Sequence, residues 1–229
     1  MNFGKSFTYI FEDPQWFDKL WKPVLCMLIP VIGPLVFQGY IMDVIKNVAN
    51  GDPRPLHEMD FGENLTMGFR NFVVQLVYSL PLIVLSWLIV IPSMLSVGAM
   101  ADEKLSLVMA VPALLSQLGL LLFSMVLSAV FYLVFPIICA HVAVKGTIKS
   151  GFEFREIFNL AKKNFAAWLM VLAGNLIAGF IGPIGVIVFF AGMFVTMAYS
   201  MLMVAHLSGQ AYRASQPTVV YPSYPNYPG

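Results

Sequence analysis

The chain has 229 residues, of which 59% are apolar and only 11% are charged, and its formal net charge is +1 at pH 7. Soluble domains carry about 25% charged residues, so this composition excludes an ordinary soluble domain. The near-neutral charge argues against a nucleic-acid partner. Apolar runs of about 18 or more residues recur, as transmembrane helices require, without the alternation of membrane β-strands. The sequence therefore predicts an all-α polytopic integral membrane protein.

The first apolar run covers residues 23–45 and follows a mixed polar and aromatic segment. Asp13 can cap a short helix that begins at the following proline, and we expect Trp16 and Trp21 of that helix to anchor it at the membrane interface. The run is broken at IPVIGP (29–34), which predicts a helical hairpin. Its first arm is short for a crossing, so two alternatives stay open, a spanning hairpin or a re-entrant one.

Two polar segments share one sequence pattern, and we call them preambles because each directly precedes a long apolar run. The pattern F-x-E-x7-N-F occurs at residues 61–72 and again at residues 154–165, in each case directly before a long apolar run. Apolar side chains recur on one face at helical spacing, and charged side chains lie opposite, as in a helix at the membrane interface. We expect Phe61 to anchor the first such helix, and Phe154 and Phe158 to anchor the second. The shared pattern predicts an internal repeat.

The apolar sequence after the first preamble is too long for one crossing. Residues 72–97 form one expected span, and a second lies at about residues 120–144. The turn between them is expected around Asp102–Lys104. The path of residues 105–118 stays open, with a bend near Pro112 or a piece lying in the membrane interface as the alternatives.

The last apolar run, residues 165–207, is also too long for one span and contains FIGPIG (180–185), where we expect a turn. Small residues recur every fourth position on both expected arms: Gly174, Ala178 and Gly182, then Gly192, Thr196 and Ser200. Such faces let helices approach closely. The partner of these faces is either the same chain or another subunit.

These elements predict three units, at about residues 11–50, 60–150 and 151–213, within a single membrane domain covering residues 1–213. Each unit is an interfacial amphipathic helix followed by a transmembrane hairpin. Residues 214–229 are rich in proline and tyrosine, and we expect a disordered tail of open function. Twelve of the 13 Lys and Arg residues fall at the ends of these units, and only Lys104 falls at a hairpin turn. The positive-inside rule then places both termini in the cytoplasm.

Several short motifs carry a resemblance to a known family. They are FEDPQW (11–16), Ile29-Pro30 with Gly39-Tyr40, LHEMDF (56–61) and GQAYR (209–213). In this order they resemble the prokaryotic multi-pass membrane protein family catalogued as domain of unknown function four thousand and thirteen. The resemblance implies a protein of the prokaryotic cytoplasmic (inner) membrane. The resemblance identifies no catalytic residues in this chain.

Reactive groups are sparse. The sequence has no glycine-rich phosphate loop, Ser-His-Asp set or Cys/His metal cluster, so we expect no enzymatic activity, no cofactor and no metal. His141 and His206 lie near expected helix ends, where an interfacial histidine needs no special role. The alternative is that both line a cytoplasmic vestibule together with Asp43.

Polar groups inside the expected spans are few and uncharged. Gln75, Gln117 and Asn175 lie there, but no acidic or basic residue lies near the middle of a span, which argues against ion-coupled transport. Our first hypothesis is a scaffold or a subunit of a larger membrane complex, with lipids, other membrane subunits or copies of itself as partners. The alternative is a passive carrier or channel for a lipid or neutral hydrophobic solute. A cavity lined by these three amides would favour the alternative, and a solid core would exclude it.

Overall fold

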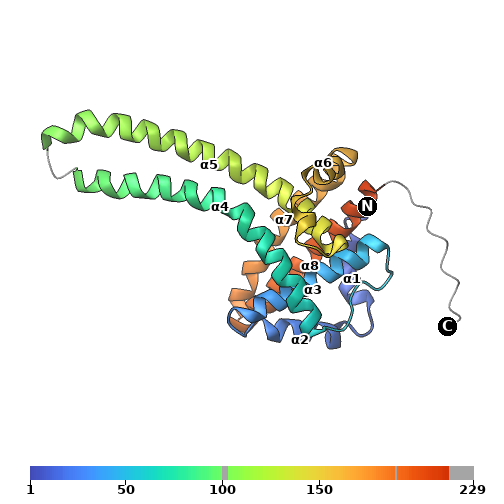
Figure 1. Ribbon diagram of the computed structural model, residues 1–229. Helices are drawn as coiled ribbons and strands as arrows, with labels where there is room; N and C mark the ends of the chain where they lie inside the picture. Colours follow the sequence, from blue (N-terminus) through green and yellow to red (C-terminus); the bar gives the residue numbers. More distant parts are fainter. Residues whose placement is uncertain (100–102, 189, 217–229) are drawn as a thin grey trace, which may run out of the picture.

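The computed structural model describes residues 1–99, 103–188 and 190–216, and every regular element in these ranges is helical. In chain order the elements are α1 (Lys5–Glu12), α2 (Trp16–Cys26), α3 (Ile32–Asn50), α4 (Phe61–Ala99), α5 (Glu103–Lys145), η1 (Lys149–Phe152), α6 (Phe154–Lys163), α7 (Phe165–Ile184), η2 (Gly185–Val188) and α8 (Phe190–Ser215). Figure 1 shows a helical body from which parts of α4 and α5 extend together as a long arm.

Four stretches among the described residues are long and apolar enough to cross a membrane. They are Phe61–Ile91 in α4, Leu114–Lys145 in α5, Phe165–Ile184 in α7 and Gly192–Ser215 in α8. At 1.5 Å per residue, each exceeds or approaches the roughly 30 Å hydrocarbon core of a bilayer. The prediction of an all-α polytopic membrane protein is confirmed.

The first hairpin is made of α2 and α3, and the chain turns between them at residues 27–31. Neither helix is among the four candidate spans. With 11 residues, α2 is about 16 Å long, which is too short to cross the bilayer. α3 lies in the centre of the body, where it packs against α4, α5 and α8 and buries Phe37, Tyr40 and Met42. A hairpin with both arms spanning is therefore not formed by α2 and α3, and the re-entrant path of residues 23–45 stays a prediction.

α3 and α4 cross at very short range because glycines face the partner backbone at the contact. A methyl group placed on Gly39 of α3 would lie 1.7 Å from the carbonyl oxygen of Asn64, and one placed on Gly68 of α4 would lie 1.8 Å from that of Leu35. The Asn64 side chain also donates a hydrogen bond to the Asp43 carboxylate beside this crossing. Only residues without a Cβ allow the two backbones to come so close.

The α4–α5 hairpin differs in two respects from the expectation. Residues 61–72 are the first turns of α4 and continue into the span without a break, so they are no separate interfacial helix. Residues 105–118, whose path the sequence left open, belong to the continuous helix α5, which has 43 residues and is about 64 Å long. The expected turn around Asp102 falls partly in residues 100–102, which lie outside the described residues.

The second preamble does form a separate helix, α6, and the two copies of the shared pattern therefore fold differently. The chain breaks between α6 and α7 at Asn164, whose side-chain oxygen accepts a hydrogen bond from the backbone N–H of Ala167 at 3.2 Å. The equivalent residue, Asn71, is buried inside α4. One asparagine begins a helix, whereas the other packs within one.

α7 and α8 form the last hairpin, and its turn lies later than expected. α7 continues through most of the FIGPIG sequence to Ile184, with Pro183 in its final turn, and the chain turns from Gly185 onward. The Thr196 hydroxyl donates to the carbonyl oxygen of Gly182 at 2.7 Å, and a methyl group on Gly185 would lie 2.3 Å from that of Gly192. The small-residue faces therefore pack against each other within one chain.

Four of the five expected interfacial anchors, Trp21, Phe61, Phe154 and Phe158, are exposed on the surface of the protein. Trp16 is instead partly buried and packs edge-on against Phe11, with ring centroids 5.3 Å apart. On α6 the exposed Phe154 and Phe158 alternate with the buried Ile157 and Leu160, which hold the helix against the body.

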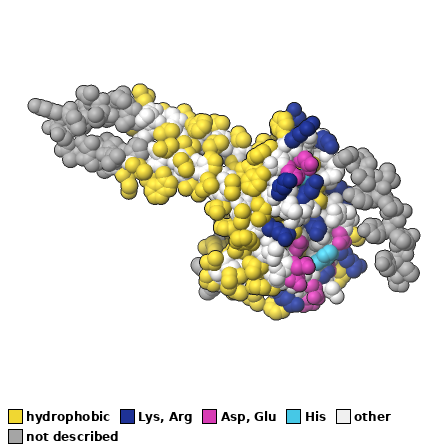
Figure 2. All heavy atoms as spheres, viewed as in Figure 1, with side chains coloured by type: hydrophobic (Ala, Val, Ile, Leu, Met, Phe, Trp, Pro, Cys, Tyr) yellow, Lys and Arg dark blue, Asp and Glu magenta, His cyan; other side chains and the backbone are white. Residues whose placement is uncertain are grey.

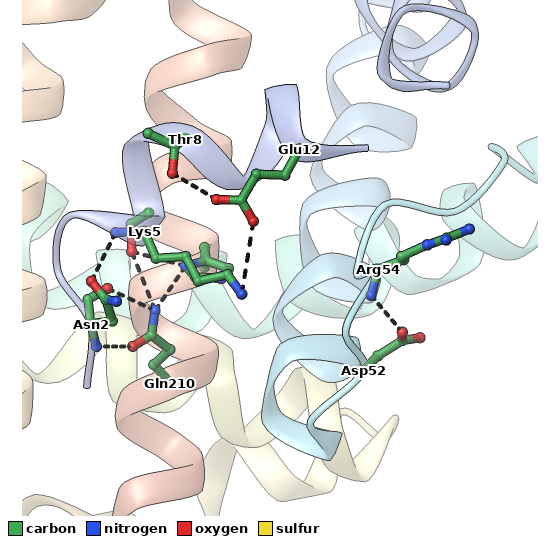
Figure 3. A network of polar contacts seen from close by, with 9 residues as sticks. Asn2, Lys5, Thr8, Glu12, Asp52, Arg54 and Gln210 are labelled. Carbon is green, nitrogen blue, oxygen red and sulfur yellow. Dashed lines mark hydrogen bonds and ion pairs between the residues drawn. The ribbon is translucent and has the colours of Figure 1, made fainter. Parts of the chain in front are cut away.

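The N-terminal residues are tied to the end of α8 (Figure 3). The backbone N–H of Asn2 donates to Gln210 Oε1 at 2.6 Å, and Gln210 Nε2 donates to the carbonyl oxygen of Asn2 at 3.1 Å. In the same network Lys5 forms an ion pair with Glu12 at 3.8 Å. α8 ends at Ser215, and residues 217–229 of the expected tail lie outside the described residues.

Charged and apolar side chains are segregated along the molecule. In the view of Figure 2, the acidic and basic side chains gather on the side of the body away from the arm, while the described part of the arm is covered by apolar ones. Because Asn2 is hydrogen-bonded to Gln210 of α8, the beginning of the chain and the end of α8 lie together at this charged side.

Candidate functional site

A cavity of about 550 Å³ opens inside the part of the body that carries the candidate spans. All four spans contribute to its wall, and α3 and the turn between α2 and α3 complete it. This volume is within the range of about 300–1,000 Å³ that small-molecule sites occupy. The body is therefore not the solidly packed core that would exclude a carrier.

The described part of the cavity wall is mainly apolar, and among its residues only Cys139 carries an ionisable group, a thiol. Aliphatic and aromatic residues such as Phe37, Phe135, Met197 and Met201 make up most of it. The side-chain amides and the hydroxyl in the wall belong to Gln38, Asn71, Gln75, Asn175 and Ser208. A wall of this kind suits an uncharged, largely hydrophobic molecule, because no charged group is available to pair with a charged one.

The amides differ in how well their hydrogen-bonding groups are satisfied. Gln38 Nε2 donates to Gln75 Oε1 at 3.2 Å, which links α3 to α4 across the wall. Asn175 Nδ2 donates to the carbonyl oxygen of Val171 at 3.1 Å within α7. The Oδ1 atom of Asn71 is buried and has no hydrogen-bond partner. Asn71 therefore contains an unsatisfied acceptor that a water-sized molecule in the cavity does not reach.

The cavity includes two of the three amides that the sequence predicted to lie in it. Gln75 and Asn175 line it, but Gln117 does not. Gln117 precedes Phe135 of the wall by 18 residues on α5, which is about 27 Å along a helix. Sequence reasoning missed Gln38 and Asn71. Asn71 is part of the pattern shared by the two preambles, and that was the available signal.

His141 lies at the end of α5 in a polar cluster with the start of α6. Its Nε2 is 2.9 Å from Glu153 Oε2 and 3.5 Å from Glu156 Oε2, and its Nδ1 is 3.1 Å from the Tyr212 hydroxyl. The imidazole is buried, whereas both carboxylates are reached by solvent. The hydrogen bond with His141 lowers the pKa of Glu153 below its ordinary value.

His206 lies elsewhere, in the contact between α1 and α8. Its Nδ1 is 2.9 Å from Ser6 Oγ and 2.9 Å from Gln210 Nε2, and its ring stacks on Tyr9 with centroids 4.2 Å apart. Asp43 pairs with Asn64 at the α3–α4 crossing. The three groups of the alternative vestibule are thus each engaged in a different cluster.

A family model matches most of the chain. Residues 24–197, about three quarters of the chain, match the family described as "Protein of unknown function (DUF4013)". No curated protein and no solved structure matches the chain significantly. The match confirms the resemblance that the ordered motifs carry, and it spans all of α3 to α7 and the first part of α8. The chain therefore belongs to the DUF4013 family of membrane proteins of unknown function.

Proposed function

We propose that this protein is a non-enzymatic membrane protein that binds one neutral, hydrophobic molecule with a small polar end, such as a lipid, in the cavity and carries it passively. The cavity between the candidate spans is the observation that carries the proposal. A passive carrier was the alternative in the sequence interpretation, and the open cavity favours it over a solid scaffold.

The polar groups of the wall indicate that the ligand has a small polar end. The side-chain amides of Gln38, Gln75 and Asn175 and the hydroxyl of Ser208 are among the lining groups. A ligand with a hydroxyl or amide N–H could exchange hydrogen bonds with such groups, which avoids the cost of about 1–3 kcal/mol for burying a polar group without a partner. The apolar remainder of the wall would hold its hydrocarbon part.

Access from the bilayer is consistent with the exposure of the α8 side of the wall. Met197 and Met201 line the cavity and are 39% and 40% exposed. Methionine is flexible and adapts to ligands of different shape. A ligand dissolved in the lipid phase would enter past these side chains without crossing water.

Transfer of an uncharged fluorescent lipid, such as a labelled ceramide, between bilayer leaflets tests the proposal. In vesicles containing the purified protein, we expect the outward movement of a labelled lipid to accelerate over protein-free vesicles, measured by quenching with an impermeant reductant. Ala178→Trp fills the cavity and is expected to reduce this acceleration at least ten-fold. Gly179→Trp is the matched control. Gly179 is the next residue on α7, it does not line the cavity, and a Cβ placed on it meets no atom within 4 Å. Equal rates for both variants, or no acceleration by the unmodified protein, would contradict passive lipid transfer.

A scaffold role has separate support from the arm. In the spans of α4 and α5 only 11% of the most apolar window is buried, against 50% in the span of α8. An α5 helix about 64 Å long is twice the thickness of the hydrocarbon core. We propose as a second function that the arm packs against other membrane subunits. Purification in a mild detergent tests this, and a lone monomer without any co-purifying protein counts against it.

We further propose that the protein lies in the cytoplasmic membrane of a prokaryote with its charged side in the cytoplasm. The positive-inside rule supports this orientation, since Lys104 lies in the first turn of α5, at the far end of the arm, and the other twelve Lys and Arg residues lie elsewhere. With Cys26 and Cys139 removed, single cysteines at 19, 54, 162 and 213 should resist an impermeant reagent in intact cells, and a cysteine at 104 should react. Labelling at position 19 from outside would refute the re-entrant first hairpin.

A further inference from the structure

Three side chains with metal-binding atoms converge where α5 meets α6. His141 Nε2, Glu153 and Glu156 each offer one ligand atom, and these atoms all lie within 4.8 Å of one another. The histidine comes from the last turns of α5, Glu153 directly precedes α6, and Glu156 lies in its first turn. The cluster is separate from the cavity, whose wall includes none of the three.

The two separations from His141 fit the shell of a small divalent cation. With bonds of about 2.1 Å to nitrogen and carboxylate oxygen, neighbouring ligands lie about 3.0 Å apart in octahedral geometry and about 3.4 Å apart in tetrahedral geometry. The distances from His141 Nε2 are 2.9 Å to Glu153 and 3.5 Å to Glu156. One nitrogen and two carboxylates form a set typical of Zn²⁺, Mn²⁺ or Fe²⁺ rather than of Ca²⁺.

The surroundings of His141 also suit a metal ligand. Its second nitrogen, Nδ1, is 3.1 Å from the Tyr212 hydroxyl of α8, so an Nδ1–H can donate to that oxygen and leave the Nε2 lone pair free. Ligating histidines commonly have such a partner on the other nitrogen. The ring is held by burial, since only 2% of the side chain is exposed.

Without a metal ion, the hydrogen bonds available to His141 leave one of the two carboxylates poorly paired. A single Nε2–H can donate well to one carboxylate, yet two carboxylates converge on it. Lys145 Nζ is 3.5 Å from Glu156 Oε2 and offsets part of that charge from the rim, where about half of each side chain is exposed. A divalent ion between the three atoms would engage all three lone pairs at once.

We propose that His141, Glu153 and Glu156 bind one divalent transition-metal ion, which fastens the start of α6 to the ends of α5 and α8. The solvent-exposed side of the site leaves further positions for water. With three protein ligands and open positions, the site resembles an exchangeable metal site more than a closed structural one. The site does not depend on the proposed lipid transfer.

Cobalt binding to the full-length chain tests the site. The protein is purified in detergent without a polyhistidine tag, stripped with a chelator, and titrated with Co²⁺, whose visible absorption reports nitrogen and oxygen ligands. We expect saturation at one ion per chain, displacement by Zn²⁺, and a rise in unfolding temperature with Zn²⁺. Glu156→Gln changes an exposed side chain and is expected to weaken Co²⁺ binding at least ten-fold, and Glu153→Gln likewise.

The matched control is Glu63→Gln, which alters the equivalent glutamate of the first preamble, also exposed in the first turn of a helix. It is expected to bind Co²⁺ like the unmodified protein. The proposal is overturned if the unmodified protein shows no saturable Co²⁺ binding, or if Glu156→Gln and Glu63→Gln bind with equal affinity. Correctly folded variants are verified by their unchanged elution as a single species before each titration.

Discussion

Replacing Gly39 or Gly68 by alanine is expected to lower the unfolding temperature of the protein strongly. The added methyl groups would lie 1.7 Å and 1.8 Å from backbone carbonyl oxygens of the facing helix. A side chain cannot move aside to relieve this contact, because the obstructing atoms are main-chain atoms, so α3 and α4 must separate. Overpacking in a core typically costs 1–3 kcal/mol, and we expect roughly 3 kcal/mol or more here. That is a large part of the 5–15 kcal/mol by which proteins are generally stable.

The yield of monodisperse protein in detergent and its unfolding temperature measure this effect. Gly119→Ala in α5 and Gly179→Ala in α7 are the controls, since a Cβ at either position meets no atom within 4 Å. Alanine inside a helix is favoured over glycine by about 0.5–1 kcal/mol, so the controls should be neutral or slightly more stable. Unfolding temperatures of Gly39→Ala and Gly68→Ala equal to those of the controls would contradict the close crossing of α3 and α4.

Replacing Phe154 and Phe158 together by aspartate is expected to lower the folded yield in the membrane far more than replacing Lys162 and Lys163 together by glutamine. Both phenylalanines are exposed on α6, at 64% and 59%, where lipid would cover them. Burying one Phe side chain in an apolar phase is worth roughly 1.5–3 kcal/mol. A basic residue near an anionic membrane contributes about 1 kcal/mol, so the apolar contribution should dominate.

The lysine pair is the matched control because it lies on the same short helix, with Lys162 Nζ 4.4 Å from the centre of the Phe158 ring. The first preamble offers no equally clean comparison, since Arg70 donates a hydrogen bond to the carbonyl oxygen of Gly146 at 2.7 Å. Fluorescence of a fused reporter and membrane fractionation measure the yield. If the lysine variant is the more damaging, α6 is better described as a docking helix for a cytoplasmic partner than as an interfacial one.

Composition and apolar run length were sufficient to predict the fold class, because a bilayer sets the length of a crossing helix. They were not sufficient for the central position of α3. Its sequence carries Gln38, Asp43 and Lys46, and its central position depends on packing of its other faces against α4 and α8. The difference between Asn71 and Asn164 likewise depends on tertiary contacts, since the two short patterns are the same.

The candidate sites were likewise predictable from the sequence only in part. Gln75 and Asn175 could be identified because polar residues in long apolar runs are few. Gln117 met the same criterion, but its position on α5 places it far from the cavity. The grouping of His141 with Glu153 and Glu156 could not be predicted from sequence. It depends on the turn through η1, which returns the chain against the end of α5.

Native mass spectrometry of the protein released from lipid nanodiscs tests the occupied cavity most directly. We expect the unmodified chain to retain one neutral hydrophobic molecule after the surrounding lipid has been removed by collisional activation, and Gly179→Trp to retain it as well. Ala178→Trp, whose added ring occupies the cavity, is expected to emerge without it. A bare unmodified chain under the conditions that preserve its fold, or equal retention by both tryptophan variants, would contradict a ligand-binding cavity in this protein.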